Sequence, residues 1–418
     1  MKKLILSATI FFIVVHIYAG GYRVALQGQK QLAMGHTGVA VINSAELVFF
    51  NPGGITYLHD DFTVSVGMNA IFNNITFRNE EFGWNTKADN EISTPFSAYM
   101  AYKITDWLSV GLGVYTPYGS STSFPTDWEG SHLVNNISLA AIFVQPTLSI
   151  KLNDKLSIGG GPIYMNGNVE YNRNLNRGLV NEQGQRSNVT IEQSGITAWG
   201  YNLGMMFLPG DKTVIGINYR SEIIAKAKNG DATFRNIPAT LSPLFPDQGF
   251  NAELPLPAEL TVGISYKITD KWLVAADFNR VFWNSYESLD IDFLINTPAL
   301  PDSVNPRNYH NTSTYRFGAQ YTANNKFVLR GGYYYDETPI PSGYFAPEIP
   351  RNDSHNFTGG LTYNFNNNFS IDFSLLYVHF EKLTDSYNYY QENGVNIPFG
   401  GTYENNALIP GLGVTYSF

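Results

Sequence analysis

Apolar and polar residues alternate along most of the chain with a two-residue period. At the C-terminus, the even-numbered residues from Leu408 to Phe418 are apolar or aromatic, and those between them are Ile, Gly, Thr or Ser. Residues 259–268, 315–321 and 369–377 repeat the pattern. Because successive side chains of a strand point to opposite faces, each stretch predicts a strand with one apolar face and one small or polar face.

Short turn signals and long irregular segments alternate between these strands. The short signals are Thr105-Asp106, Asn153-Asp154, Gly210-Asp211, Thr269-Asp270, Asn324-Asn325 and Asn366-Asn367. The long segments lie near residues 74–93, 118–136, 173–190, 229–257, 295–311, 337–352 and 383–406. This alternation predicts an all-β fold, a 14-stranded antiparallel transmembrane β-barrel over residues 61–418. The alternative, a soluble β-sandwich, would bury its apolar faces against each other and has no need of loops that alternate in length.

The first residues have the pattern of a signal peptide. Lys2 and Lys3 precede an apolar run from Leu4 to Val15, and the small residue Ala19 follows. A helix of that run would span about 18 Å, which is too short for a hydrocarbon core of about 30 Å. We therefore predict a signal peptide over residues 1–19. Export, the strand pattern and the terminal aromatic Phe418 together predict the bacterial outer membrane as the location.

Charge and composition exclude several classes of function. The net charge is −9, whereas a nucleic-acid binder needs a basic surface. Cys is absent, so disulfides and thiolate chemistry are excluded. The six His beyond the signal peptide show no metal-ligand spacing, and no Ser lies in a G-x-S-x-G elbow. We expect no enzyme activity, cofactor or metal. The alternative is an outer-membrane phospholipase or protease.

Residues 20–60 lack the alternation and are rich in Gly and Ala. A short helix is predicted within residues 27–34, and Asn51, Pro52 and Gly53 predict a turn because Pro fixes φ and Gly tolerates positive φ. Fourteen strands enclose more space than their own side chains fill. We predict that this segment, the hatch, is a plug inside the lumen, and a periplasmic tail is the alternative.

Four groups of residues carry a resemblance to a known family. The motifs are Ala33-Met34-Gly35 with Gly38-Val39-Ala40 and Asn51-Pro52; Gly111 through Gly119; Leu256 through Gly263 with Trp272, Asp277 and Trp283-Asn284-Ser285-Tyr286; and Leu329 through Tyr333 with Tyr335 through Pro339. In order and spacing they resemble the outer-membrane long-chain fatty acid transporters of the FadL type, which include the TodX-type aromatic hydrocarbon channels. The chain departs from the family at residues 349–353, where the family usually has an acidic residue directly after the Pro.

The resemblance implies passive uptake of hydrophobic compounds: long-chain fatty acids, related lipids or aromatic hydrocarbons. It implies a third strand kinked inward, at Pro117, Tyr118 and Gly119 here, that releases substrate sideways into the membrane. Pro has no N–H for a strand ladder, which agrees with a kink, although Pro117 could instead end its strand. The alternative function is a general diffusion porin for small polar solutes.

The expected partners follow from the same resemblance and location. They are a hydrophobic small molecule, the lipid and lipopolysaccharide of the outer membrane, and the outer-membrane barrel assembly machinery. We expect a monomer and no nucleic acid.

The segment 229–257 is too apolar for a solvated loop. Five of its residues are the predicted capture residues for substrate: Phe234, Leu241, Leu244, Phe245 and Phe250. An exposed apolar patch often marks a binding site, although an inert lid would have the same composition.

Arg316 and Arg330 lie in predicted strands. An Arg on the lipid face costs about 2–4 kcal/mol at the bilayer midplane, so both are expected to face the lumen. There they could hold a substrate carboxylate, or pair with lumen carboxylates or the hatch.

Overall fold

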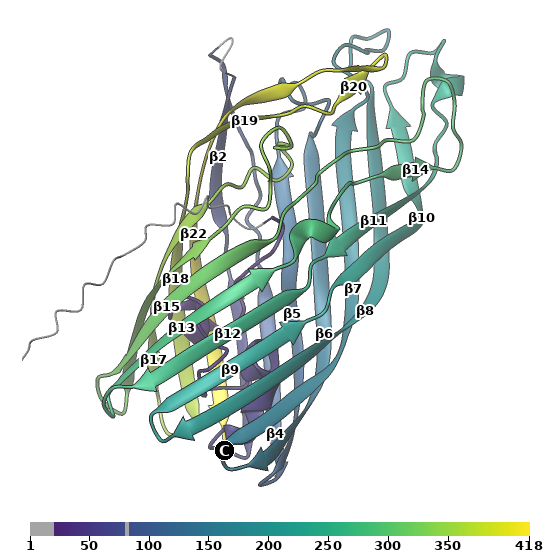
Figure 1. Ribbon diagram of the computed structural model, residues 1–418. Coiled ribbons are helices and arrows are strands. Elements are labelled where there is room, and N and C mark those ends of the chain that lie inside the picture. The colour runs from purple at the N-terminus through teal and green to yellow at the C-terminus, as the bar shows by residue number, and fades with distance from the viewer. Residues whose placement is uncertain (1–20, 80–82) are drawn as a thin grey trace, which may run out of the picture.

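The computed structural model describes residues 21–79 and 83–418, so the predicted signal peptide lies outside the described residues. The described chain forms one closed antiparallel barrel (Figure 1). The ring closes where Thr63–Asn69 pair with Gly411–Ser417. The predicted fold class, a barrel of fourteen strands with an N-terminal plug, is confirmed for the described residues.

Three of the fourteen wall strands consist of two consecutive elements, because the ladder is interrupted part-way along them. In order around the barrel the strands are β1 (Phe62–Asn69) with β2 (Phe72–Arg78), β4 (Phe96–Thr105), β5 (Leu108–Ser123), β6 (Asn136–Asn153), β7 (Leu156–Asn174), β8 (Asn188–Gly210), β9 (Thr213–Arg220) with β10 (Ile223–Arg235), β11 (Gln248–Leu256) with β12 (Glu259–Lys267), β13 (Trp272–Val281), β15 (Thr312–Thr322), β16 (Phe327–Asp336), β17 (Ser354–Asn364), β18 (Phe369–Phe380) and β22 (Phe399–Ser417).

The six predicted short turns all connect neighbouring wall strands at one end of the barrel, and the long loops gather at the other end (Figure 1). The loops carry β3 (Asn85–Lys87), η2 (Ser242–Leu244), η3 (Trp283–Ser285), β14 (Ile291–Phe293), β19 (Leu383–Tyr387), β20 (Gln391–Glu392) and β21 (Val395–Asn396). Among the described residues, no helix is long and apolar enough to cross a membrane.

The prediction of a loop over residues 229–257 was wrong in extent. β10 runs to Arg235 and β11 starts at Gln248, so the loop covers only residues 236–247. The strands continue because β10 pairs with both β8 and β11 beyond the level at which a loop was expected. Other long segments are shortened in the same way, since β8 alone has 23 residues.

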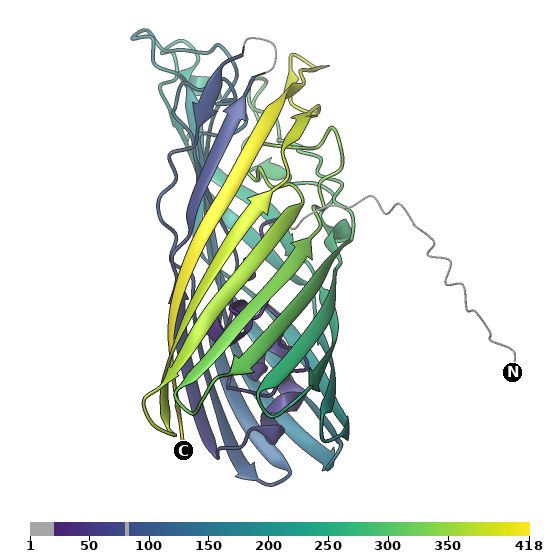
Figure 2. The ribbon, with the colours of Figure 1, turned by 90° about the vertical axis from the view of Figure 1, so that its left-hand side faces the viewer.

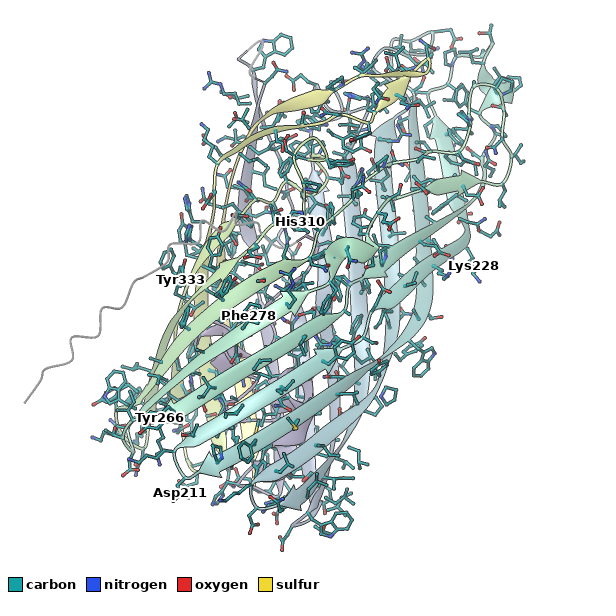
Figure 3. The ribbon with its side chains drawn as sticks, viewed as in Figure 1. Asp211, Lys228, Tyr266, Phe278, His310 and Tyr333 are labelled. Carbon is teal, nitrogen blue, oxygen red and sulfur yellow. The ribbon has the colours of Figure 1, made fainter. Side chains whose placement is uncertain are left out.

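The outer face of the wall is apolar, as the alternation predicted. Figure 3 shows Tyr266 near the short turns and Phe278 higher on the wall, and these side chains are 45% and 42% exposed. Asp211 lies in a short turn, and Lys228 lies nearer the long loops than Phe278 does (Figure 3). This distribution is that of a barrel surrounded by lipid.

The hatch lies inside the lumen (Figure 2). It contains α1 (Gln29–Leu32), α2 (Leu47–Phe50) and η1 (Pro52–Tyr57). The contacts reach several sides of the wall: α1 packs on β17, β18 and β22, and η1 packs on β5, β6, β7 and β8. The short helix predicted within residues 27–34 is therefore present as α1.

Candidate functional site

The third wall strand, β5, separates from β4 part-way along its length. The β4–β5 ladder ends at Ser97 opposite Tyr115, while the β5–β6 ladder continues to Ser123 with a register shift between Tyr115 and Tyr118. Thr116 caps the end of the β4 ladder, because its Oγ1 lies 3.2 Å from both the N and the O of Phe96. Pro117 does not end the strand, and the interruption falls where a residue without an N–H stands.

Nearer the long loops, the segment before β4 bonds to the end of β5. The N–H of Asp89 donates to the carbonyl of Ser123 at 2.8 Å, and the N–H of Ser123 donates to Oδ1 of Asn90 at 2.9 Å. Within the described residues, no backbone hydrogen bond joins 117–122 to 91–95. At about 3.3 Å per residue, the ladder is interrupted over roughly 20 Å of the wall.

The N-terminal arm, residues 21–27, takes the place of β4 beside the kink. The N–H of Val24 donates to the carbonyl of Pro117 at 2.8 Å, and the N–H of Gly119 donates to the carbonyl of Tyr22 at 3.1 Å. Tyr118 is 2% exposed, and its hydroxyl donates to the carbonyl of Pro257 at 3.1 Å. The backbone left unpaired by the kink is thus satisfied from inside the barrel.

Arg23 fixes the arm to four wall strands. Its guanidinium donates to Glu259 on β12, Asn279 on β13, Thr314 on β15 and Asp336 on β16, at 2.5–3.0 Å. The two carboxylates form ion pairs with it, each at 3.0 Å. These four acceptors hold the arm against the wall, although among the described residues the Nε of Arg23 has no hydrogen-bond partner.

Arg351, in the segment that departs from the family pattern, also binds the arm. Its Nη1 donates to the carbonyls of Gly21 and Arg23, at 3.1 Å each. Two residues later, burial raises the pKa of the Asp353 carboxyl to about 8. Asp353 accepts from the Tyr335 hydroxyl at 2.5 Å and from the N–H of Thr338 at 3.1 Å. The loop of residues 337–353 therefore carries both the arginine that binds the arm and, two residues later, a titratable carboxyl.

An aromatic compartment surrounds Tyr22. The Tyr22 ring packs edge-on against Trp283 and Tyr286, with centroids 4.9 Å and 5.6 Å apart, and lies 6.2 Å from Tyr118. Tyr309 extends the compartment, at 4.9 Å from Tyr286. These side chains are at most 5% exposed, so they form a closely packed aromatic cluster beside the kink.

The turn at Asn51, Pro52 and Gly53 is attached to the wall strands that follow the kinked β5 around the barrel. Asn51 is fully buried, and its amide donates to the carbonyls of Val39 and Met205 at 2.8 Å and 2.9 Å. The carbonyl of Gly53 accepts from the hydroxyls of Ser149 and Ser157, on β6 and β7. This turn is therefore bonded directly to three neighbouring strands.

Two wall glycines allow the turn to approach so closely. A Cβ at Gly159 would lie 2.6 Å from the carbonyl carbon of Pro52, and one at Gly204 would lie 2.3 Å from Oδ1 of Asn51. Any side chain at either position would displace the turn.

The predicted capture residues are not an exposed patch. Phe234, Phe245 and Phe250 are at most 9% exposed, and Leu241 and Leu244 are half-buried beside them. The Phe234 ring lies 5.9 Å from Phe245. The structure thus brings Phe234 and Phe245 together, whereas Phe250 stands opposite Phe293 of β14. The role of these residues in capture stays a prediction.

Arg316 and Arg330 both point into the barrel but have different surroundings. Arg316 is 5% exposed and its Nη1 lies 3.5 Å from the carbonyl of His36 in the hatch. Arg330 donates to Gln320 at 2.8 Å and to Thr362 at 2.5 Å, both on neighbouring strands. Arg316 lines a cavity beside the arm, and Arg330 does not line it.

A family model matches residues 10–418, described as outer membrane protein transport protein (OMPP1/FadL/TodX). The chain belongs to this family. It is 25% identical to a putative outer membrane protein of Neisseria meningitidis serogroup B, over 100% of this chain and 99% of that one. It is 22% identical to the long-chain fatty acid transport protein of Escherichia coli K12, over 90% and 92% of the two chains.

Solved structures of the family share the fold. A FadL homologue of Pseudomonas aeruginosa superimposes with a TM-score of 0.82 at 18% identity, covering 96% of this chain and 100% of that one. The toluene transporter TodX of Pseudomonas putida superimposes with a TM-score of 0.69 at 17% identity, covering 96% and 99%. The chain is therefore an outer-membrane barrel, and its long loops face the exterior, as in other such barrels.

Sequence reasoning missed several residues that the structure places at this family member's kink. Tyr22, Arg23, Arg220 and Glu259 were given no role, although Glu259 stood on the polar face of a predicted strand. A usable signal was available for Arg220, because a charged residue in a strand of a transmembrane barrel must face the lumen or the rim.

Proposed function

We propose that the chain carries hydrophobic compounds passively across the outer membrane and releases them sideways through the wall beside the kink. Substrate is captured among the long loops at Phe234, Leu241, Leu244, Phe245 and Phe250. It then enters the aromatic compartment, displaces the arm and leaves between β4 and β5 into the bilayer. The observation that carries the proposal is the interrupted β4–β5 ladder, which the arm of the hatch closes from inside.

The physical argument starts from the cost of unpaired backbone. In a bilayer, an N–H or C=O without a partner costs several kcal/mol, so an interrupted ladder is retained only where something else satisfies it. Here the arm does so, at Pro117 and Gly119. Displacing the arm would open the wall only while a ligand occupies its place.

The names of the relatives support a hydrophobic substrate. One relative is a long-chain fatty acid transport protein, and one structural neighbour is a toluene transporter. The aromatic compartment suits either kind of molecule, because each buried CH₂ gains about 0.8 kcal/mol.

A general diffusion porin is the second candidate, and the hatch argues against it. An open pore needs a free lumen, whereas the turn at Asn51–Gly53 is bonded to β6, β7 and β8. Swelling of liposomes in small sugars separates the two functions, since only a porin admits sugars at high rates.

The test of lateral release straightens β5. Replacing Pro117 by Val and Gly119 by Thr, or deleting one residue between them, should restore pairing with β4 and reduce uptake of labelled dodecanoate to background. Ser138→Val, which adds a β-branched residue to the neighbouring β6, is the control and should keep normal uptake. Surface amounts and heat-modifiable gel mobility must be equal. Normal uptake by a variant whose crystal structure has a continuous β5 would contradict lateral release and favour a route through the hatch.

A further inference from the structure

The loop of residues 337–353, between β16 and β17, is packed against the rest of the protein. Surface loops are normally exposed, but apart from Ser342 the residues of this loop are buried or half-buried. Ile340, Phe345 and Ile349 are at most 6% exposed and belong to the main hydrophobic cluster. We call this segment the inner loop. Its position is set by its contacts with other parts of the chain and not by solvent.

A buried ion pair joins the inner loop to the loop before β15. Glu348 and Arg307 are each 4% exposed, and the guanidinium donates to the carboxylate. The guanidinium also lies over the ring of Tyr387, at the end of β19, with 4.9 Å between its Cζ and the ring centroid. Two charges held out of water depend on each other, so the loss of either leaves the other without compensation. Three of the long loops are therefore held together at this pair.

The other polar contacts between these loops are exposed or partly buried. The Tyr344 hydroxyl accepts from the Asn308 amide at 2.8 Å and from the Tyr389 hydroxyl at 2.7 Å. The N–H of Gly343 donates to Asp385 at 3.1 Å. Water can replace hydrogen bonds at such positions, whereas it cannot readily replace the partner of a buried charge. The ion pair is therefore the polar contact whose loss should loosen the inner loop most.

The inner loop also holds the arm, three residues beyond the ion pair. Nη1 of Arg351 donates to the carbonyls of Gly21 and Arg23, at 3.1 Å each. At about 3.5 Å per residue, three residues span at most about 11 Å. A movement of Glu348 away from Arg307 is therefore transmitted to Arg351.

The ion pair and the arm both border the aromatic compartment. The N–H of Arg307 donates to the carbonyl of Glu287 at 2.7 Å, and the N–H of Tyr309 donates to the carbonyl of Tyr286 at 3.1 Å. The rings of Tyr286 and Tyr309 are in contact, and the Tyr286 ring also packs on Tyr22 of the arm. A ligand that enters among these rings would therefore meet the surroundings of the ion pair and the arm together.

We infer that the inner loop is a gate on the exterior side whose opening releases the arm. While the pair of Arg307 and Glu348 is closed, Arg351 keeps the arm on the kink. When the pair opens, the inner loop withdraws, Arg351 leaves the carbonyls of the arm, and the arm becomes free to move. Such coupling is reciprocal, so displacing the arm also loosens the gate. The inference rests on the proposed function and adds how the movement of the arm is controlled.

Hydrogen exchange at the bonds between the arm and the kink tests the coupling without any transport. The two amides are those of Val24 and Gly119, which donate to the carbonyls of Pro117 and Tyr22. Such amides exchange when their bonds open, so the exchange rate reports how often the arm leaves the kink. The rate is measured by mass spectrometry on the purified whole protein in detergent.

Glu348→Gln breaks the ion pair and should speed the exchange of both amides about tenfold or more. Arg351→Gln frees the arm directly and should speed the exchange at least as much. The control is Arg330→Gln, which removes a buried arginine that is bonded to Gln320 and Thr362 and not to the inner loop. It should change the rate less than about twofold. If Glu348→Gln lacks the heat-modifiable band, Glu348→Asp, which keeps the charge on a shorter side chain, replaces it under the same criterion.

An unchanged rate in a folded Glu348 variant would overturn the inference, because the ion pair would then be a structural contact without influence on the arm. The same acceleration in Arg330→Gln would overturn it as well, because the loosening would then be general. Failure of the proposed function would appear separately, as wild-type protein that takes up no labelled dodecanoate.

Discussion

The two ends of the hatch are attached to the barrel in different ways. The turn at Asn51–Gly53 presents its backbone to wall glycines and hydroxyls, so it cannot move without opening a close-packed interface. The arm at residues 21–27 is held by two backbone bonds at the kink and by the long side chains of Arg23 and Arg351. Ion pairs and side-chain bonds can be exchanged for others one at a time. Under the proposed function, we therefore expect the arm to move during transport while the turn stays in place.

Removing the Arg23 guanidinium should have the largest effect on stability. Arg23→Met leaves Glu259 and Asp336, whose side chains are 12% and 16% exposed, without their cation, and breaking a mostly buried pair in this way costs up to about 3–5 kcal/mol. Urea unfolding in detergent micelles measures the loss. Adding Glu259→Gln to the variant should restore part of the lost stability, because it removes the uncompensated charge. An unfolding curve for Arg23→Met identical to that of the wild type would mean that the bonds from Arg23 to these strands do not stabilise the protein.

Removing the Asn51 amide should lower the free energy of unfolding by less, and it acts on the turn at Asn51–Gly53. Asn51→Ala leaves the carbonyls of Val39 and Met205 without this donor, which costs roughly 1–3 kcal/mol. Combined with Pro52→Ala, it should alter uptake while heat-modifiable gel mobility is retained, because the barrel ladder does not depend on the turn. Pro52→Ala alone keeps the amide and serves as the control. Loss of the folded band would show that this segment is part of the barrel core.

A further expected effect is a pH dependence of the free energy of unfolding, from Asp353 in the loop that carries Arg351. Its pKa is raised from 3.8 to about 8, so the folded protein favours the protonated form. The free energy of unfolding should therefore fall as the pH rises from about 4 to about 8 and then level off. Asp353→Asn should remove this slope and protect the loop from protease above pH 8. An unchanged slope in that variant would assign the titration to another group.

The strands of the wall could be predicted from the sequence because the pattern of a strand is visible within a few neighbouring residues. Alternation, Asp and Asn turns and the Pro at 117 are visible within a few residues, and all of them appear in the structure. The loop over residues 229–257 was overestimated because Phe234 and Phe250 were taken as exposed, whereas the strand period continues through them and turns them inward.

The arrangement at the kink could not be predicted in the same way. Arg23 and Glu259 are 236 positions apart, and a single sequence does not show which distant side chains a closed barrel brings together. For the same reason, the sequence predicted the same lumen position and the same roles for Arg316 and Arg330. Only the position of the hatch shows that Arg316 faces a cavity and that Arg330 is bonded to its neighbouring strands.

The most direct test of lateral release locks each part of the hatch in turn. The chain has no Cys, so paired cysteines form one defined disulfide. A Cβ at Gly119 would lie 3.7 Å from Cγ2 of Val24, and a Cβ at Gly67 would lie 2.9 Å from Cγ of Gln29. Val24→Cys with Gly119→Cys therefore ties the arm to the kink, and Gln29→Cys with Gly67→Cys ties the body of the hatch to β1.

Uptake of labelled dodecanoate is measured for both pairs before and after reduction. Lateral release predicts that the arm lock abolishes uptake, that reduction restores it, and that the body lock leaves uptake normal. Loss of uptake in the oxidised body lock together with normal uptake in the oxidised arm lock would contradict the account, because substrate would then have to pass through the hatch.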